Sequence, residues 1–287
     1  MKIKIAIPKG HLESKTLKLL EDAGIGVGSR DERQLFIRTN DPDIELVLVR
    51  AEDIPDIVGQ GATDLGITGI DLVMENNREK DIVELFDLGY GGANLVVAAP
   101  KSSGIKSVKD IKPGTRVATE FPNATKKFFK KKGINVEVVR VTGATEITPL
   151  IGVADIIVDV TSTGTTLRTH GLQIIDTIVE STSRLIANPE SLKKAKSKIE
   201  DVKVAMESVI RASDKKLVMM NVPEAKLDAV KNIMPGMSGP TVSKVEAKGL
   251  LAIQVVVEAS CVYELVCKVK KEGARDILVM PIERILP

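Results

Sequence analysis

Carboxylate and hydroxyl side chains are concentrated in one short segment, Ala154 to Arg168, which reads ADIIVDVTSTGTTLR. Its apolar run, 156–158, predicts a buried strand, and Asp159 comes at the carboxyl end of that strand. A turn follows this strand and leads into a helical pattern. The turn consists of Thr161, Ser162, Thr163, Gly164, Thr165 and Thr166. A turn that opens a helix points backbone amides at an anion, and the helix dipole favours negative charge there. The segment therefore predicts a cradle for a sugar phosphate.

Each residue type in this segment has a role in such a cradle. Serine and threonine hydroxyls can donate to phosphate oxygens, Gly164 allows a close approach, and the Asp159 carboxylate can accept from ribose hydroxyls. Asp155 lies at the other end of the predicted strand, about 13 Å away by strand rise, so we predict a structural role for it. The alternative for the whole segment is an ordinary strand, turn and helix whose hydroxyls only cap the helix.

The segment resembles the phosphoribosyl-diphosphate loop of phosphoribosyltransferases, and its flanks resemble one family, ATP phosphoribosyltransferase, nearly from end to end. The motifs that carry this resemblance follow the family's order: IPKG at 7–10, VRAEDIP at 49–55, GATDLGITGID at 61–71, ATEFPN at 118–123, TGATEITPLIG at 142–152 and TSTGTTLRTHGL at 161–172. A carboxy-terminal PGMSGPTVS, at 235–243, resembles the regulatory domain of the family's long form.

The resemblance implies a reaction. The N1 nitrogen of ATP would displace pyrophosphate from the anomeric carbon of phosphoribosyl diphosphate, the first step of histidine biosynthesis. Two polyanionic substrates require cationic groups, and Mg²⁺ is the implied cofactor, held mainly by substrate oxygens. No metal ligand from the protein is assigned. An oxocarbenium-like transition state would be stabilised by a nearby carboxylate, so Asp159 is the predicted catalytic residue beside Lys9.

ATP binding is predicted for residues at strand ends and in neighbouring turns, namely Lys9, Arg33, Arg50, Gly69 and Glu146. For each basic residue the alternative is an ordinary surface charge, and for Glu146, placed at the start of a predicted helix, it is helix capping. No catalytic histidine is assigned. This sequence departs from the family's pattern at His11, His170, Ala93 and Asn94. Relatives often have arginine at position 94, so Asn94 is not expected to provide that basic contact.

Alternating strand-like and helical patterns predict an α/β fold with a largely parallel sheet. An internal echo, IAIPKGHLESKTLKLLEDAGI against RVATEFPNATKKFFKKKGI, predicts two similar lobes with a cleft between them, although generic α/β units also look alike. Gly66, Thr68 and Gly69 are predicted to form the first lobe's matching turn, with Asp71 capping the next helix. The fold class expected is thus a two-lobed, periplasmic-binding-protein-like catalytic region with a carboxy-terminal ferredoxin-like (ACT-like) regulatory domain.

The predicted boundaries follow from the order of these patterns. Lobe I should comprise residues 1–90 and about 182–210, lobe II residues 91–181, and the regulatory domain residues 211–287. A crossing between the lobes is expected at 90–92, and one long helix is expected from Pro189 to about Ile210. Beyond it, the order strand, helix, two strands, helix, strand is that of a split βαβ unit.

The composition excludes several classes of protein. A formal charge of +2 and 2% aromatic residues give no platform for nucleic acid. No export signal or membrane-spanning run is present, so we expect a cytoplasmic protein with no membrane partner. Cys261 and Cys267 lack disulfide or metal-site spacing and are predicted to be reduced packing residues.

Regulation is implied by the long-form resemblance. L-histidine would bind the third domain through Ser238 and Thr241 and inhibit by favouring a less active arrangement of subunits, in a homo-oligomer such as a dimer or hexamer. A simple structural turn is the alternative for PGMSGPT. At position 221, a carboxylate could pair with the ammonium group of histidine. The sequence has Asn221 there, so histidine binding is less strongly indicated than catalysis.

Three other functions are compatible with the pattern. A bilobal α/β chain can be a solute-binding module, but it has no export signal and its TSTGTT turn exceeds what simple capture requires. A short-form catalytic subunit that needs a separate partner is disfavoured by the ferredoxin-like unit. An amino-acid sensor that has lost catalysis is disfavoured by the retained phosphoribose motif.

Overall fold

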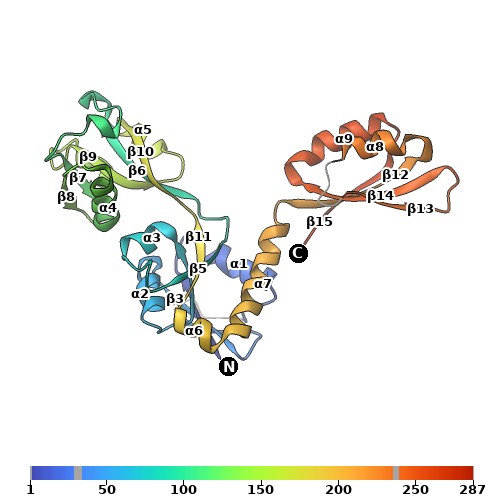
Figure 1. The fold of residues 1–287 in the computed structure, drawn as a ribbon, viewed down its shortest axis with the longest axis horizontal. Coiled ribbons are helices and arrows are strands. Elements are labelled where there is room, and N and C mark those ends of the chain that lie inside the picture. Colours follow the sequence, from blue (N-terminus) through green and yellow to red (C-terminus); the bar gives the residue numbers. More distant parts are fainter. Residues whose placement is uncertain (1, 29–33, 235–238, 287) are drawn as a thin grey trace. The chain divides into compact units, whose positions relative to one another are not determined.

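The computed structural model describes residues 2–28, 34–234 and 239–286. The chain divides into two compact units, of which the first is Met1–Glu21 with Ile25–Lys203 and the second is Asp22–Gly24 with Val204–Pro287. Within the described residues, the first unit contains a six-stranded and a five-stranded sheet, and the second a four-stranded sheet (Figure 1). This arrangement confirms the predicted two-lobed α/β region followed by a ferredoxin-like domain.

The first sheet is built mainly from the amino-terminal part of the chain. In spatial order its strands are β2 (Phe36–Arg38), β3 (Ile44–Val49), β1 (Ile3–Pro8), β4 (Leu65–Gly69), β11 (Ser183–Ala187) and β5 (Val83–Asp87). The accompanying helices are α1 (Glu13–Asp22), α2 (Ile54–Gly59) and α3 (Ile70–Glu75). Branched aliphatic side chains, Ile5, Ile7 and Leu46 among them, are completely buried, as expected for a core with few aromatic residues.

The second sheet provides the strand that carries Asp159, and this strand continues to Thr161. In spatial order its strands are β10 (Leu172–Ser181), β6 (Ala93–Pro100), β9 (Ile156–Thr161), β7 (Arg116–Thr119) and β8 (Glu137–Arg140). The helices are α4 (Pro122–Lys132) and α5 (Thr165–Thr169). Phe129 of α4 is buried and stacks edge-on against Phe128, while the lysines of this helix face solvent.

The prediction of a largely parallel sheet is wrong. β1 is parallel to β3 and β4, and β7 is parallel to β8 and β9. The remaining neighbours in the two sheets pair antiparallel, namely β2 with β3, β4 with β11, β11 with β5, β10 with β6, and β6 with β9. The chain leaves the first sheet after β5, continues in β6, and returns through β10 into β11 (Figure 1). Hydrophobic periodicity shows which residues are buried but carries no strand direction, so these returning strands were not recognised.

Two local predictions in this unit also need correction. Gly66, Thr68 and Gly69 lie within β4 rather than in a turn, and Thr68 is buried with its hydroxyl donating to the Ala51 carbonyl at 2.9 Å. Asp71 does not cap α3, because Gly69 is the N-cap residue and makes no side-chain cap. The Asp71 carboxylate accepts instead from the Ser181 hydroxyl at 2.5 Å.

The long helix predicted from residue 189 is interrupted. α6 (Pro189–Lys194) ends at Ala195, whose φ of −120° is not helical, and α7 (Lys196–Ala212) begins directly afterwards. Asn188 caps α6 by accepting from the backbone amides of Glu190 and Ser191. The helical spacing of apolar residues continues across Ala195, so the sequence pattern does not reveal the break in the helix.

The second unit has the predicted split βαβ order. Its elements are β12 (Lys215–Pro223), α8 (Leu227–Ile233), β13 (Thr241–Lys244), β14 (Leu250–Glu258), α9 (Val262–Lys271) and β15 (Arg275–Pro281). The strands pair antiparallel in the order β13-β14-β12-β15, which is the ferredoxin-like topology. Cys261 and Cys267 are free, but both are exposed, so their predicted packing role is wrong. They fall on the solvent side of α9, whose buried residues are Leu265 and Val269.

Gly66 allows α2 to pack closely on β4. A Cβ atom built there would lie 2.6 Å from Ile54 Cγ2 and 2.7 Å from Val58 Cγ2, both of which are buried. We expect Gly66→Ala to lower the free energy of unfolding by about 2 kcal/mol, because the core cannot accept the added methyl without moving the helix. Urea denaturation measures this loss, and Gly92→Ala is the comparison, because Gly92 also has no left-handed φ but has open space around its Cβ. An equal loss in both variants would contradict the packing argument.

No helix within residues 2–28, 34–234 and 239–286 has both the length and the apolar character that a membrane crossing requires.

Candidate active site

Two basic side chains lie at neighbouring strand ends in the first sheet. The backbone amide of Lys9 donates to the Val49 carbonyl at 2.8 Å, which extends the parallel pairing of β1 and β3 by one residue. Lys9 and Arg50 therefore follow adjacent strands at the carboxyl edge of the sheet, and both are exposed. Ligands of open α/β sheets bind at this edge, so the two cations are placed to meet an anion.

Asp159 lies near the carboxyl end of β9 in the second sheet and is half-buried. Its Oδ1 accepts from the backbone amide of Val160 at 2.7 Å. Burial, reinforced by the negative charges of Glu146 and Glu120, raises the pKa of Asp159 to about 6. A carboxylate destabilised in this way gains most when positive charge develops beside it.

The hydroxyl-rich turn follows Asp159 directly. The Thr161 hydroxyl accepts from the Gly164 amide at 2.8 Å, and Gly164 has the left-handed φ of 68° that this turn requires. The hydroxyl oxygens of Thr163 and Thr165 lie 3.0 Å apart. The side chains of Ser162, Thr163, Thr165 and Thr166 are exposed, as a ligand loop requires. The turn thus presents several hydroxyl donors beside one carboxylate.

A cleft of about 950 Å³ is lined by residues of two lobes, one built on the first sheet and one on the second. Arg50 lines it from the first lobe, and Lys126 and Arg140 from the second. Its carboxylates are Glu52, Asp53, Asp56, Glu75 and Glu120. This volume is in the range of small-molecule sites, so the cleft has room for a nucleotide-sized ligand.

Glu120 and Arg140 were missed by the sequence reasoning. Glu120 follows β7, which pairs in parallel with β9, so it comes next to Asp159 at the same edge of the sheet. Arg140 ends β8, opposite Thr119 of β7. The signal that identified Lys9 and Arg50, a polar residue at the carboxyl end of a predicted strand, was present at both positions, and Glu120 stands inside the quoted ATEFPN motif.

The other predicted residues fall in different surroundings. Arg33 and Ser238 lie outside the described residues. Gly69 ends β4, and a Cβ atom there would lie 2.2 Å from Asp71 Oδ1, so only glycine fits. Glu146 does not begin a helix as predicted but lies in a short 3₁₀ turn, Thr145–Ile147, where its charge acts on Asp159.

A magnesium ion was predicted without protein ligands. In the described parts of the chain, no three His, Cys, Asp or Glu side chains gather as a metal cage. Two carboxylates, those of Asp159 and Glu146, are available near the hydroxyl-rich turn. Mg²⁺ commonly keeps most of its ligands as water and substrate phosphate, with one or two protein carboxylates, so this donor set fits an ion carried by the substrates.

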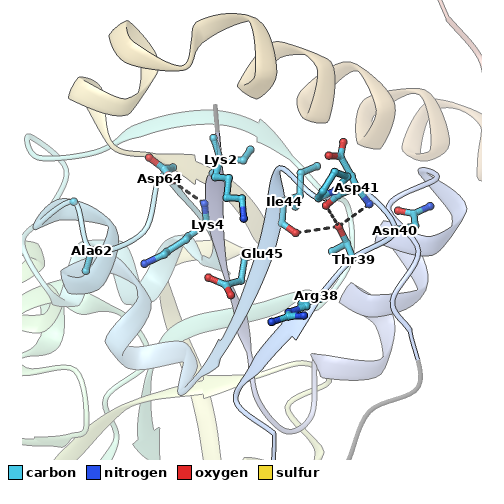
Figure 2. Close-up of a pocket in the computed structure, with 13 residues that line it drawn as sticks. Lys2, Lys4, Arg38, Thr39, Asn40, Asp41, Ile44, Glu45, Ala62 and Asp64 are labelled. Atoms are coloured by element: carbon cyan, nitrogen blue, oxygen red, sulfur yellow. Dashed lines mark hydrogen bonds between the residues drawn. The ribbon is translucent and has the colours of Figure 1, made fainter.

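A second hollow of about 680 Å³ lies at the opposite, amino edge of the first sheet (Figure 2). Arg38, Glu45 and Lys4 occupy directly paired positions on β2, β3 and β1, and Asp64 accepts from the Lys4 amide at 2.7 Å. Figure 2 shows these four residues in one row. Their alternating charges offset one another across strands, which is a stabilising surface arrangement rather than a site for an anion.

In the carboxy-terminal unit, Thr241 is exposed at the start of β13. The Asn221 side chain, on β12, donates to Asp276 Oδ2 at 2.9 Å. A carboxylate is therefore present beside the position where the sequence reasoning found only an amide. Asp276 was missed because it lies 55 residues further along the chain and reaches Asn221 only through the pairing of β12 with β15.

Comparisons with known proteins agree along the whole chain. A family profile described as ATP phosphoribosyltransferase matches residues 50–208, and one described as HisG, C-terminal domain matches residues 212–284. A protein named ATP phosphoribosyltransferase from Methanosarcina barkeri is 50% identical over 292 residues, covering 99% of this chain and 100% of the relative. One of the same name from Methanocaldococcus jannaschii is 50% identical over 288 residues, again covering 99% and 100%.

A solved structure is similar over most of the chain. It is titled ATP phosphoribosyl transferase (HisG:HisZ) complex from Thermotoga maritima, with a TM-score of 0.65 and 29% sequence identity. The similarity covers 74% of this chain and 98% of that chain. The match of the present chain to the C-terminal domain, at residues 212–284, makes it a long form and contradicts the short-form alternative.

Proposed function

Because this chain belongs to the long-form ATP phosphoribosyltransferase family, whose members are pentosyltransferases that open histidine biosynthesis, we propose that it transfers the 5-phosphoribosyl group of phosphoribosyl diphosphate to N1 of ATP and releases pyrophosphate. One observation of the structure carries this proposal. Asp159, at the end of β9, is followed directly by an exposed hydroxyl-rich turn, so a carboxylate and a phosphate cradle lie side by side.

The turn supports binding of phosphoribosyl diphosphate. Its exposed hydroxyls, on Ser162, Thr163, Thr165 and Thr166, can donate to phosphate oxygens, and Gly164 keeps a side chain out of their way. The internal hydrogen bond from the Gly164 amide to Thr161 holds the turn before ligand arrives. Such preorganisation lowers the ordering cost of binding.

Asp159 is the proposed catalytic carboxylate. As the bond to pyrophosphate breaks, positive charge develops on the ribose, and an adjacent ionised carboxylate stabilises it. With a pKa of about 6, Asp159 is mostly ionised at neutral pH. The attacking adenine nitrogen has its own lone pair, so the reaction needs positioning more than a general base.

Nucleotide binding is proposed for the facing edge of the first lobe. Lys9 and Arg50 offer cations there, Gly69 would contribute its backbone at the end of the neighbouring strand β4, and Glu146 would contribute from the second lobe. Arg33, outside the described residues, is retained from the family resemblance. Mg²⁺, when bound, would neutralise charge on the pyrophosphate leaving group, with Asp159 or Glu146 as its protein contact. Lys9 also offsets the charge on the reacting phosphates.

We propose the same division of the chain as the sequence indicated: residues 1–90 with about 182–210 as lobe I, residues 91–181 as lobe II, and residues 211–287 as a regulatory domain. L-histidine would bind the last of these near Ser238 and Thr241 and inhibit the enzyme. Asp276, beside Asn221, offers a carboxylate, but it lies on β15, at the opposite edge of this sheet from Thr241 on β13. A homo-oligomer, dimer or hexamer, is expected to be the active form.

The test uses the purified full chain alone. With ATP, phosphoribosyl diphosphate and Mg²⁺ we expect pyrophosphate release and a product with the mass of phosphoribosyl-ATP, both abolished by a chelator. A double variant, Asp159→Ala with Thr163→Ala, should lose the product while it keeps its thermal transition. Added histidine should slow the wild-type reaction. Folded protein that binds both substrates yet forms no product would contradict the proposal and favour a sensor that has lost catalysis.

A further inference from the structure

One polar contact joins the two lobes away from the strands that connect them. Glu75, the last residue of α3 in the first lobe, meets the amino terminus of α4 in the second lobe. The Asn123 amide donates to Glu75 Oε1 and Oε2 at 3.2 and 3.0 Å, and the Ala124 amide donates to Oε2 at 3.0 Å. The Asn123 side-chain amide donates in turn to the Glu75 carbonyl at 2.8 Å.

This contact supplies what α4 lacks in its own sequence. The N-cap residue of α4 is Phe121, which has no side chain able to cap, and Pro122 begins the helix. A helix amino terminus has unpaired amides and a partial positive charge, both of which a carboxylate satisfies. Glu75 is therefore the capping group of α4, supplied from the other lobe.

Burial outweighs the amides and cations around Glu75, so its pKa is raised above the ordinary value for a glutamate. The side chain is half-buried, while the amides of Ala124 and Asn123 and the positive charges of Arg140 and Lys126 oppose the rise. An exposed ion pair between Lys127 of α4 and Glu79, just after α3, flanks the contact. Exposed pairs contribute little, so the carboxylate capping is the main polar link between these two helices.

The contact bears on the site because the cleft is lined from both lobes. Arg50 belongs to the first lobe and Arg140 to the second, and Glu75 and Asn123 themselves line the cleft between them. The two crossing segments also join the lobes, and they are tied to each other where the Ser183 amide donates to the Tyr90 carbonyl and the Leu88 amide to the Ser183 carbonyl. The Glu75 contact lies apart from those segments, between α3 and the amino terminus of α4.

We propose that Glu75 is a positioning residue for the transferase reaction: by capping α4 across the cleft it holds the two lobes at the separation at which one nucleotide can contact both. The inference rests on the proposed function. When the contact is made, the cleft still has a volume of about 950 Å³, so the capped state admits ligand. Loss of the contact lowers the fraction of molecules with an assembled cleft, and the apparent affinity falls by that fraction.

Substitution of Glu75 should separate binding from turnover. Glu75→Ala should raise the Kd and KM for ATP about tenfold, while kcat stays within about twofold, because saturating nucleotide restores the assembled cleft. Glu75→Gln keeps an acceptor for the amides but loses the charge, so we expect the Kd and the KM for ATP each to rise about threefold. Hydrogen exchange of the 121–125 peptide should be faster in Glu75→Ala and slower when ATP binds to wild type.

Two controls separate this role from simple destabilisation. Asp110 accepts from the amides of Lys106 and Ser107 at 3.0 and 2.9 Å within the second lobe. Asp110→Ala therefore removes the same kind of contact inside one lobe, and it should leave the Kd for ATP unchanged. Phosphoribosyl diphosphate, held by the 161–166 turn of one lobe, should bind Glu75→Ala as it binds wild type.

The outcomes are distinct. Equal weakening of both substrates, or an unchanged Kd for ATP in Glu75→Ala despite faster exchange, would overturn the positioning role. Absence of product from wild-type protein would instead refute the proposed function, and the two binding measurements would still show whether Glu75 governs the assembly of the cleft.

Discussion

Asp159→Asn should lower kcat by about 10²-fold or more, with KM values for both substrates changed much less. The substitution preserves shape and removes only the charge that stabilises the developing oxocarbenium ion, and preorganised electrostatic groups typically have effects of this size. Steady-state kinetics with each substrate varied in turn measure it. Asp155→Asn is the matched control, because Asp155 immediately precedes the same strand but forms an ion pair with Arg116 at 2.8 Å. Equal losses of kcat in the two variants would contradict a specific role for Asp159.

The wild-type pH profile provides an independent check of the same residue. The ionised form is the active one, so the rate should fall with acid, reaching about half near pH 6 and about a tenth near pH 5. In Asp159→Asn this limb should disappear from the residual rate. A limb that persists unchanged in the variant would assign the titration to another group.

Stability should change in the opposite direction to activity. The folded-state pKa of Asp159 lies above the ordinary value of 3.8, so ionisation favours the unfolded chain, and stability is lost as pH rises from about 4 through 6. Asp159→Asn removes this loss. After allowance for solvent screening of a partly exposed group, we expect a gain of about 1–2 kcal/mol at pH 8 that vanishes near pH 4. Urea denaturation at the two pH values measures the difference.

The second large effect is expected in the hydroxyl-rich turn. Thr163→Ala combined with Thr165→Ala removes two donors 3.0 Å apart and should raise the Kd for phosphoribosyl diphosphate about 10²-fold, because each hydrogen bond to a charged group contributes roughly 1.5 kcal/mol or more. The Kd for ATP alone should stay within about twofold. Titration calorimetry with each substrate measures both constants.

Thr169→Ala is the control for this turn. Thr169 is also exposed and lies on α5, but its hydroxyl donates to the Thr165 carbonyl at 3.1 Å and so is directed into the helix. It should bind phosphoribosyl diphosphate as wild type does. If the control weakens binding as much as the double variant, the effect belongs to the stability of α5 and not to hydroxyl donors.

The sequence by itself determined the family and the two-lobed α/β class with its ferredoxin-like domain, and it indicated the proposed site around Asp159. These features are local: an apolar strand, a carboxylate at its end and a glycine-containing hydroxyl turn occur within a few residues, where side-chain type and spacing carry the chemistry. The carboxy-terminal order of strands and helices was likewise readable from periodicity, because each element buries one face in its own small core.

The tertiary structure alone decided which distant residues meet. The antiparallel returns of β10 and β11, the pairing that brings Glu120 beside Asp159, and the contact of Asp276 with Asn221 all depend on strand order, which hydrophobic spacing does not encode. Glu75 and Asn123 are 48 residues apart, and each looks like an ordinary surface residue in the sequence. Their contact exists because an uncapped helix in one lobe requires an acceptor that only the other lobe supplies.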